Sequence, residues 1–279
     1  MARVIRVESK LRVRRRKRRL VYVALGLGAL IIFISILCGL SWLPFLRIKA
    51  VTVDGEKTVM REHIERVAYN NIKGGYFHIL AKSNVFLYPR RAIEHDLMQQ
   101  YPTLSTVKVK AATFTSLAIT VTERSPAALW CGTSVASSTG GCYLVDKDGV
   151  VYAPAVVYSD DVYQRYFGGV TGALPWQYLP AEVFRSLSVL LATVAQKQNV
   201  VLDTIYINEV GDVHATFTNG FTLIFASNAN AGDILQRFTL ALSADVFRAH
   251  GLADFDYLDL RFGNKLYYKL HTDSQQATH

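Results

Sequence analysis

The chain has 279 residues, 51% of them hydrophobic, and a formal net charge of +9. Residues 1–19 contain ten Lys or Arg and one Glu, so this segment alone has a net charge of +9 and residues 20–279 are neutral as a whole. Binding to a nucleic-acid backbone depends on clustered cationic side chains, so this distribution excludes an electrostatic basis for nucleic-acid binding by the body of the protein.

The segment between Arg19 and Arg47 contains no charged residue and no histidine. Within it, residues 21–42 would form a helix about 33 Å long at about 1.5 Å per residue, enough to cross a bilayer core of about 30 Å. A secretory signal peptide has a shorter apolar region and a small-residue cleavage site, which the sequence SWLP at residues 41–44 does not provide. We therefore predict an uncleaved transmembrane helix over residues 21–43.

Six consecutive cations at residues 14–19 precede this helix. Such a run is found in nucleic-acid patches and nuclear addresses, but beside a membrane span it favours the positive-inside interpretation. The sequence thus predicts a basic cytoplasmic tail over residues 1–20 and an extracytoplasmic body. Inside the span, the pairs Ala24/Gly28 and Ser35/Gly39 would let a second helix approach closely, although small residues are also common in membrane helices.

Three cysteines are consistent with this placement. Cys38 lies in the predicted span, whereas Cys131 and Cys142 flank the sequence GTSVASSTGG. In an oxidising compartment these two would form a disulfide, which would contribute roughly 3 kcal/mol by closing a short loop. The alternative is a pair of buried free thiols.

Residues 44–124 predict a small α+β domain. A strand ends at Asp54-Gly55, Thr58 is positioned to cap a first helix, and a second helix starts near Pro89. Two alternating strands follow, near residues 106–111 and 117–122. In this order of strand, helix, helix, strand and strand, both helices would cover one face of a three-stranded sheet.

Residues 125–271 predict a second, strand-rich α+β domain, and residues 272–279 a disordered tail. Residues 129–131 and 142–145 would pair, while residues 158–179 have no clear period and indicate a surface connection. Asn219-Gly220 suits a type I′ hairpin turn. The other expected elements are helices near 183–194 and 233–249, and strands near 204–208, 213–218, 221–225, 257–262 and 265–270.

No motif predicts catalysis. The sequence has no HExxH or GxSxG spacing. The densest acidic cluster is Asp254, Asp256 and Asp259 near His250, which we interpret as a solvated loop and strand start rather than a metal site. We therefore expect no enzyme activity, cofactor, metal or small-molecule substrate.

Four ordered segments resemble the bacterial cell-division family FtsQ/DivIB. FLRIKAVTVDG at residues 45–55 resembles the start of its POTRA domain, and VTERSPAALW at 121–130 resembles its V-x-E-R-x-P-x-A junction. YLVDKDGVVY at 143–152 resembles its L-V-D-x-x-G hairpin, and LDLRFGNKLYY at 258–268 its final D-L-R strand pair. The resemblance implies a POTRA domain, a β domain and a place in the inner membrane at the division septum.

The same resemblance implies that the protein is a non-catalytic scaffold that binds FtsB, itself joined to FtsL. The expected contact residues are Leu266, Tyr267, Tyr268 and Lys269 on the last strand, where an open sheet edge would accept a partner strand. The alternative is that the lysines only protect the edge and both tyrosines pack on the core. Val51 and Val53 are candidate contacts in the first domain.

Two further functions remain open at this point. One is a membrane-anchored POTRA-containing protein of envelope assembly or secretion, which would normally continue into a membrane β-barrel. The other is an anchored extracytoplasmic enzyme, which the missing catalytic motifs disfavour.

Overall fold

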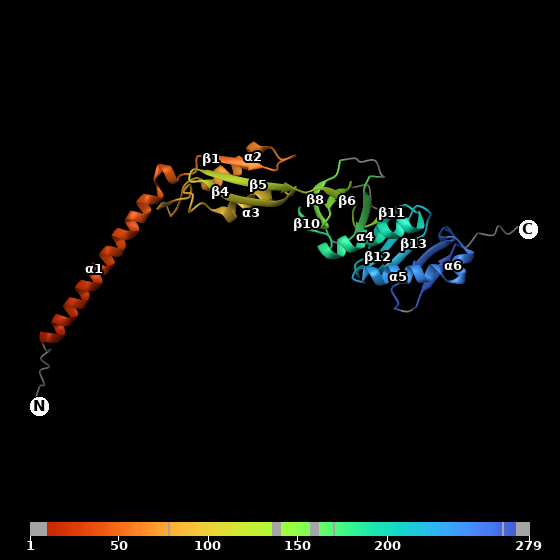
Figure 1. Cartoon of the computed structure of the whole chain (residues 1–279). Helices are drawn as coiled ribbons and strands as arrows, with labels where there is room; N and C mark the ends of the chain where they lie inside the picture. The colour runs from red at the N-terminus through yellow and green to blue at the C-terminus, as the bar shows by residue number, and fades with distance from the viewer. Residues whose placement is uncertain are drawn as a thin grey trace, which may run out of the picture. The chain divides into compact units, whose positions relative to one another are not determined.

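The computed structural model describes residues 10–77, 79–135, 141–156, 162–169, 171–263 and 265–271 (Figure 1). The chain forms two compact units, Met1–Glu123 and Arg124–His279. The boundary lies one residue before the predicted one, and the tail predicted over 272–279 falls outside the described residues.

A single long helix opens the described chain. Helix α1 spans Lys10–Ser41, and its part Lys17–Ser41 is long and apolar enough to cross a membrane. None of the apolar window is buried inside the protein, and an exposed apolar surface of this extent marks a region of contact with a membrane or another protein. The helix begins earlier than the predicted span, inside the basic tail. After it comes the 3₁₀ helix η1, Pro44–Leu46, where Pro44 stands at the first positions.

The rest of unit 1 is a three-stranded sheet with two helices, in the predicted order. The strand order is β1-β5-β4, in which β1 runs parallel to β5 and β4 runs antiparallel to it. A small antiparallel β2–β3 pair between the helices is an addition that the sequence did not predict. The elements are β1 Ala50–Asp54, α2 Arg61–Ile72, β2 Gly75–Tyr76, β3 Leu80–Ala81, α3 Arg90–Gln100, β4 Leu104–Thr113 and β5 Ser116–Glu123.

The core of unit 1 lies between the helices and one face of the sheet. Ile64 of α2 and Ile93 of α3 are fully buried there, together with Val109 and Ile119 of the sheet. These residues occupy the positions that helical and strand periodicity assigned to the inner face. The exposed residues of α2 are all polar, as expected for a single-sided core: Arg61, Glu62, Arg66 and Asn70.

The predicted cap of α2 is wrong. Met60, which is exposed, occupies the N-cap position and makes no side-chain cap bond. The backbone N–H groups around Thr58 instead donate to the Glu123 carboxylate at the end of β5, at 2.7 Å from Lys57, 2.8 Å from Thr58 and 3.1 Å from Val59. The Glu123 carboxylate therefore holds the segment just before α2, and Thr58 takes part in this contact through its backbone N–H rather than as a helix cap.

Unit 2 is built on a ten-stranded sheet of order β10-β8-β7-β6-β9-β11-β12-β13-β14-β15. Helices α4 and α5 lie next to each other (Figure 1) and bury their apolar sides in the main core of the unit. The elements are β6 Pro126–Trp130, β7 Tyr143–Asp146, β8 Val150–Pro154, β9 Gln164–Gly168, β10 Trp176–Gln177, α4 Ala181–Gln198, β11 Leu202–Ile207, β12 Asp212–Phe217, β13 Thr222–Ala226, α5 Ala231–Leu242, α6 Asp245–Ala249, η3 Leu252–Asp254, β14 Phe255–Asp259 and β15 Tyr267–Leu270.

The surface connection predicted over 158–179 is wrong at Gln164–Gly168 and Trp176–Gln177, which form strands β9 and β10. Strand β9 lies inside the sheet, parallel to both β6 and β11, and Tyr166 and Phe167 are both buried. Tyr166 faces the main core and Phe167 the opposite cluster, which also contains Leu129 and Cys131. A strand buried on both faces shows no apolar–polar alternation, so periodicity could not reveal it.

Two local predictions in unit 2 also need correction. The single helix expected over 233–249 is two helices, because Ala244 adopts extended backbone between α5 and α6. The turn at Asn219-Gly220 is not type I′, since only Gly220 has a positive φ there, +89°, and its N–H donates to Phe217. A type I turn followed by a glycine bulge matches this geometry.

The junction between the units explains two of the sequence motifs. Glu123 binds within unit 1, whereas the adjacent Arg124 forms an ion pair with Asp146 of unit 2. Asp146 also accepts the N–H groups of Asp148 at 2.9 Å and Val150 at 3.0 Å, which shapes the β7–β8 turn. The E-R and L-V-D motifs therefore have structural roles in this fold.

The structure joins Cys131 and Cys142 in a disulfide with a Cα–Cα distance of 4.2 Å. The two cysteines directly follow β6 and precede β7, which pair as predicted, with Trp130 opposite Tyr143. The two bonded cysteines are 11 positions apart in the sequence, so the disulfide closes a short loop. Cys38 is the one free cysteine.

Candidate partner-binding edge

The last strand, β15, lies at one end of the ten-stranded sheet. Among the described residues it pairs only with β14, antiparallel, with Asp259 opposite Tyr267 and Leu258 opposite Tyr268. The other end of the sheet is the two-residue strand β10. An edge strand has backbone N–H and C=O groups that a further strand can pair with, so β15 is the longer of the two open edges.

Alternate residues of β15 face opposite sides of the sheet. Tyr268 lies on the helix-covered side, where its ring centroid is 5.5 Å from that of Phe247 in α6 and 5.7 Å from that of Phe255 in β14. The side chain nevertheless remains 41% exposed. Tyr268 is thus both a packing residue and a surface residue, which combines features of the two sequence interpretations.

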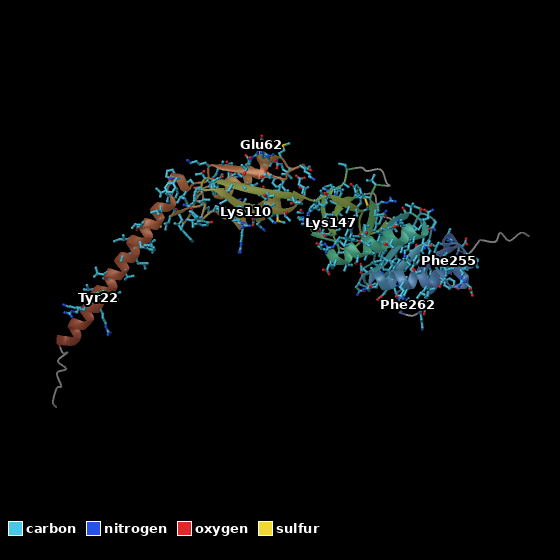
Figure 2. All side chains as sticks on the ribbon, in the orientation of Figure 1. Tyr22, Glu62, Lys110, Lys147, Phe255 and Phe262 are labelled. Carbon is cyan, nitrogen blue, oxygen red and sulfur yellow. A yellow bond between two sulfur atoms is a disulfide. The ribbon has the colours of Figure 1, made fainter. Side chains whose placement is uncertain are left out.

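Tyr267 lies on the other side of the sheet and is 48% exposed. Its ring meets that of Phe262 edge to face at 5.1 Å between centroids, and the guanidinium of Arg261 lies 5.3 Å from the centroid of Phe262. Phe262 is at the surface of unit 2, whereas Phe255 is inside it (Figure 2). This exposed aromatic pair offers contact area with little loss of side-chain freedom.

Lys269 is held by an acidic neighbour. Its Nζ atom is 2.5 Å from Oδ2 of Asp256, which also pairs with His271. A register shift in the β14–β15 pairing between Phe255 and Tyr257 leaves Asp256 without an opposite residue. The Lys269 ammonium lowers the pKa of the Asp256 carboxyl, and a partner that uses Lys269 must compete with this pair.

Leu266 borders a groove beside β15. The groove has a volume of about 770 Å³ and lies between α5 and the segment that joins β14 to β15. Its lining combines apolar residues with both signs of charge: Asp233, Gln236, Arg237, Leu240, Ala241, Ala244, Leu260, Gly263, Lys265 and Leu266. The predicted contact residues 266–269 are therefore brought to one edge of unit 2.

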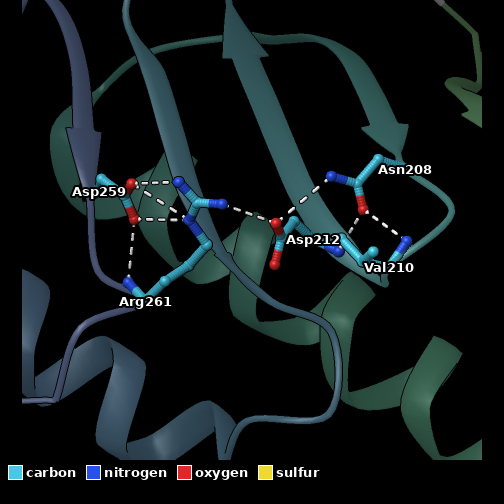
Figure 3. Close-up of polar contacts among 5 residues, drawn as sticks. All are labelled: Asn208, Val210, Asp212, Asp259 and Arg261. Atoms are coloured by element: carbon cyan, nitrogen blue, oxygen red, sulfur yellow. Dashed lines mark hydrogen bonds and ion pairs between the residues drawn. The ribbon is translucent and has the colours of Figure 1, made fainter.

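Arg261 fixes this edge to the middle of the sheet (Figure 3). Its guanidinium donates to both carboxylate oxygens of Asp259, with 2.6 Å between Nη2 and Oδ2. Its Nη1 atom also donates to Oδ2 of Asp212 at 2.6 Å. Asp212 also accepts from the Asn208 amide at 3.3 Å, and Asn208 in turn accepts the N–H groups of Val210 and Asp212. The network ties the end of β14 to the β11–β12 turn.

The Arg261 network has clear electrostatic consequences. Burial alone would raise the pKa of the Asp259 carboxyl, but its hydrogen bonds to Arg261 outweigh burial and lower it. The carboxylates of Asp259 and Asp212 raise the pKa of the Arg261 guanidinium, and the effect of Asp259 is the larger. The pKa of the nearby His214 is lowered, first by burial and second by the positive charge of Arg261. Asp259 and Arg261 are thus a permanent ion pair at neutral pH.

Val51 and Val53 are not part of an exposed surface. Both side chains belong to the core of unit 1, with Val53 only 1% exposed. Apolar alternation in β1 reports the inner face of the sheet, so the sequence assigned to partner contact two residues that pack inside. Strand β1 is itself at a sheet edge, which leaves its backbone rather than these side chains as a contact surface.

The acidic residues considered as a cation site do not converge. Asp254 pairs with His250 at 3.8 Å and accepts the Gly251 N–H, Asp256 pairs with Lys269, and Asp259 pairs with Arg261. In the part of the chain that the structure describes, no group of three or more His, Cys, Asp or Glu side chains is arranged to hold a metal ion.

The sequence matches no protein-family model and no curated protein sequence.

The site residues that sequence reasoning missed are Phe247, Arg261 and Phe262. Arg261 and Phe262 stand in the D-L-R segment directly before the last strand, so the motif contained the signal. Phe247 could not be found this way, since its role depends on the break between α5 and α6.

Proposed function

We propose that this protein is a non-catalytic, single-pass membrane scaffold of the bacterial division machinery. It binds an FtsB/FtsL-like partner by addition of a strand to β15. The observation that carries this proposal is the open, aromatic edge of unit 2, where Tyr267 and Phe262 are exposed next to unpaired backbone. The four ordered motifs and the apolar helix α1 support the division context and the location in the inner membrane, with the N-terminus in the cytoplasm.

The chemistry of strand addition assigns separate roles to backbone and side chains. Backbone hydrogen bonds along β15 supply affinity, and alternate side chains select the partner. Tyr267 and Lys269 would read the partner on the open side of the sheet, while Leu266 and Tyr268 would read it on the side of the groove beside α5. Membrane anchoring raises the local concentration of a partner held in the same bilayer, so a short strand suffices.

The test is purification of the full chain from membranes with its partner, in variants of one residue each. Tyr267→Glu should reduce recovery of a small coiled-coil membrane protein by about tenfold or more, which corresponds to about 1.4 kcal/mol. Val189→Glu is the matched control, since Val189 is an exposed apolar residue of unit 2 on α4 and makes none of the contacts described for β15. Unchanged recovery with Tyr267→Glu would place the partner on another surface.

A further inference from the structure

Several large apolar side chains of unit 1 are exposed around the end of α1. Their exposed fractions run from 42% for Trp42 to 91% for Phe77. Isolated exposed apolar residues are ordinary, but a contiguous group marks a surface that contacts something other than water. The members of this group, here called the aromatic pole, are Trp42, Phe45, Phe77, Ile79, Phe86 and Phe114.

Buried hydrogen bonds attach part of the pole directly to the last turn of α1. Ser41, the last residue of the helix, accepts the Ala81 N–H through its hydroxyl at 2.9 Å, and its carbonyl accepts from the Asn84 amide at 3.0 Å. Both Ser41 and Asn84 are buried. The Trp42 indole N–H donates to the Ile79 carbonyl at 2.8 Å. The loop that carries Phe77, Ile79 and Phe86 is therefore fixed to the helix end.

The β4–β5 hairpin brings Phe114 to the same place. The N–H of Lys49 donates to the Thr115 carbonyl at 2.8 Å, only a few residues after the helix. The Phe114 and Phe86 rings are 6.3 Å apart between centroids. The N–H of Val85 donates to the Leu46 carbonyl at 2.9 Å, which closes the group. Segments far apart in sequence thus place aromatic rings beside the point where α1 ends.

Charge divides unit 1 in the same way. Residues 41–53, 73–93 and 104–122 contain no Asp or Glu. Near the helix end, the Arg47 guanidinium lies 5.0 Å from the Trp42 ring centroid and the Lys82 ammonium 5.4 Å from that of Tyr76. Strands β1 and β5 are parallel and start at the same end of the sheet, with Ala50 opposite Ser116. The acidic residues Asp54, Glu56 and Glu123 lie at or just beyond the other end of these strands.

We propose that the aromatic pole inserts into the interface of the bilayer that α1 crosses, so that unit 1 lies docked on the lipid surface. Aromatic rings occupy the headgroup level of membranes, and Arg and Lys place their stems in the apolar region with their charges at the headgroups. The occupant is lipid because the pole is continuous with the span: Ser41 ends α1 and belongs to the hydrogen-bonded group that holds the pole. This inference depends on α1 crossing the membrane and not on the partner of β15.

The test places single nitroxide labels on the full chain in phosphatidylcholine and phosphatidylglycerol vesicles at high lipid excess, where copies of the chain are dilute. The labels go on Phe77→Cys, Phe86→Cys and Phe114→Cys in a Cys38→Ser background, since Cys131 and Cys142 are bonded to each other. The measured quantity is the ratio of collision rates with oxygen, which enters lipid, to those with a water-soluble nickel chelate.

We expect a ratio at the three pole positions severalfold above that at Val210→Cys, an exposed apolar position of unit 2, and below that at Leu30→Cys in the middle of α1. A pole ratio equal to that of Val210→Cys, with a high ratio at Leu30→Cys, would overturn the docking while leaving the anchor intact. A low ratio at Leu30→Cys would overturn both. Phe86→Ser with Phe114→Ser should lower the ratio of a label at Phe77→Cys, with unchanged circular dichroism.

Discussion

Arg261 links the candidate edge to the middle of the sheet through its contacts with Asp259 and Asp212. Arg261→Ala would leave Asp259, which is only 4% exposed, as a buried carboxylate without its cation. Hydrogen bonds to charged groups contribute about 1.5–3 kcal/mol, and the partial exposure of Arg261 moderates the larger loss seen for fully buried pairs. We expect a loss of about 2–3 kcal/mol in the free energy of unfolding of unit 2, measured by denaturant titration of the detergent-solubilised chain.

A matched substitution separates this effect from the general loss of an arginine. Arg185 of α4 pairs with Asp148 at 3.0 Å, and both side chains are exposed. Exposed pairs contribute little, so Arg185→Ala should change the free energy of unfolding by less than about 1 kcal/mol. Equal effects of the two substitutions would show that the Arg261 network contributes nothing specific.

Glu123 gives unit 1 a pH-dependent contribution to stability. Burial alone would raise the pKa of its carboxyl, but three backbone N–H groups outweigh burial and lower it. A lowered folded-state pKa stabilises the fold fully above the unfolded value of about 4.3, and this contribution disappears as the pH falls through the folded pKa. Glu123→Gln should therefore cost about 1–2 kcal/mol at neutral pH, with the difference from the unsubstituted chain shrinking below about pH 4.

Thermal unfolding followed by circular dichroism at several pH values measures this difference. Glu62→Gln is the control, because Glu62 is an exposed acidic residue in the first turn of α2 (Figure 2), where its interaction with the helix dipole is worth a few tenths of a kcal/mol. A Glu123→Gln deficit that stays constant from neutral to acidic pH would contradict the role of the ionised carboxylate.

At the scale of elements, the sequence predicted those with one buried face. α3 and α4, and the paired strands β4 and β5, alternate apolar and polar residues at the period of their backbone, so their type and place were readable. Strand β9 was not readable, since Tyr166 and Phe167 are neighbours buried on opposite faces. Nor was the break at Ala244, where apolar residues continue at helical spacing into α6.

The candidate edge was predictable only in part, for related reasons. The local pattern of residues 266–269 predicted a last strand. The place of that strand at the end of the sheet depends on strand order, which no local pattern encodes. The distinction between Tyr267 and Tyr268 depends on α6, which supplies Phe247. Val51 and Val53 were misjudged because an apolar strand residue belongs to the core unless another observation shows that it is exposed.

The end of β9 offers a sharp test of the observed sheet order. Gly168 has φ +89°, and a Cβ atom there would lie 1.8 Å from the Ile207 carbonyl oxygen of the adjacent β11. Gly168→Ala must therefore push β9 and β11 apart, in addition to adopting a disfavoured backbone conformation. We expect a loss of at least about 3 kcal/mol in the free energy of unfolding of unit 2, or failure to fold.

Gly220→Ala isolates the steric part of that loss. Gly220 has the same φ of +89° and lies in the same unit, but the nearest atom to an added Cβ is the His271 Nε2 at 3.7 Å, an ordinary contact. Its cost should stay near about 1 kcal/mol, typical of a non-glycine residue in the left-handed region. Similar unfolding free energies for the two variants would contradict the close pairing of β9 with β11.

At the scale of the whole molecule, the charge distribution, the apolar helix and the disulfide all bear on the orientation of the chain in the membrane. The net charge lies in residues 1–19, before the uncharged part of α1, while the disulfide lies in unit 2, after α1. Cationic residues beside a span stay in the cytoplasm, and disulfides persist in oxidising compartments. If the tail determines orientation, then it also determines whether Cys131 and Cys142 are oxidised, although they are far away in the sequence.

Replacement of residues 14–19 by serine should thus make part of the population insert with the opposite orientation, with unit 2 in the cytoplasm. In a Cys38→Ser background, two thiols per inverted chain would then react with a maleimide-polymer under denaturing, non-reducing conditions, and a shifted band would report them. Lys108→Ser with Lys110→Ser is the control, since these exposed lysines lie in the neutral body and should leave the disulfide complete. A complete disulfide in the tail variant would contradict the assignment of orientation to the cationic run.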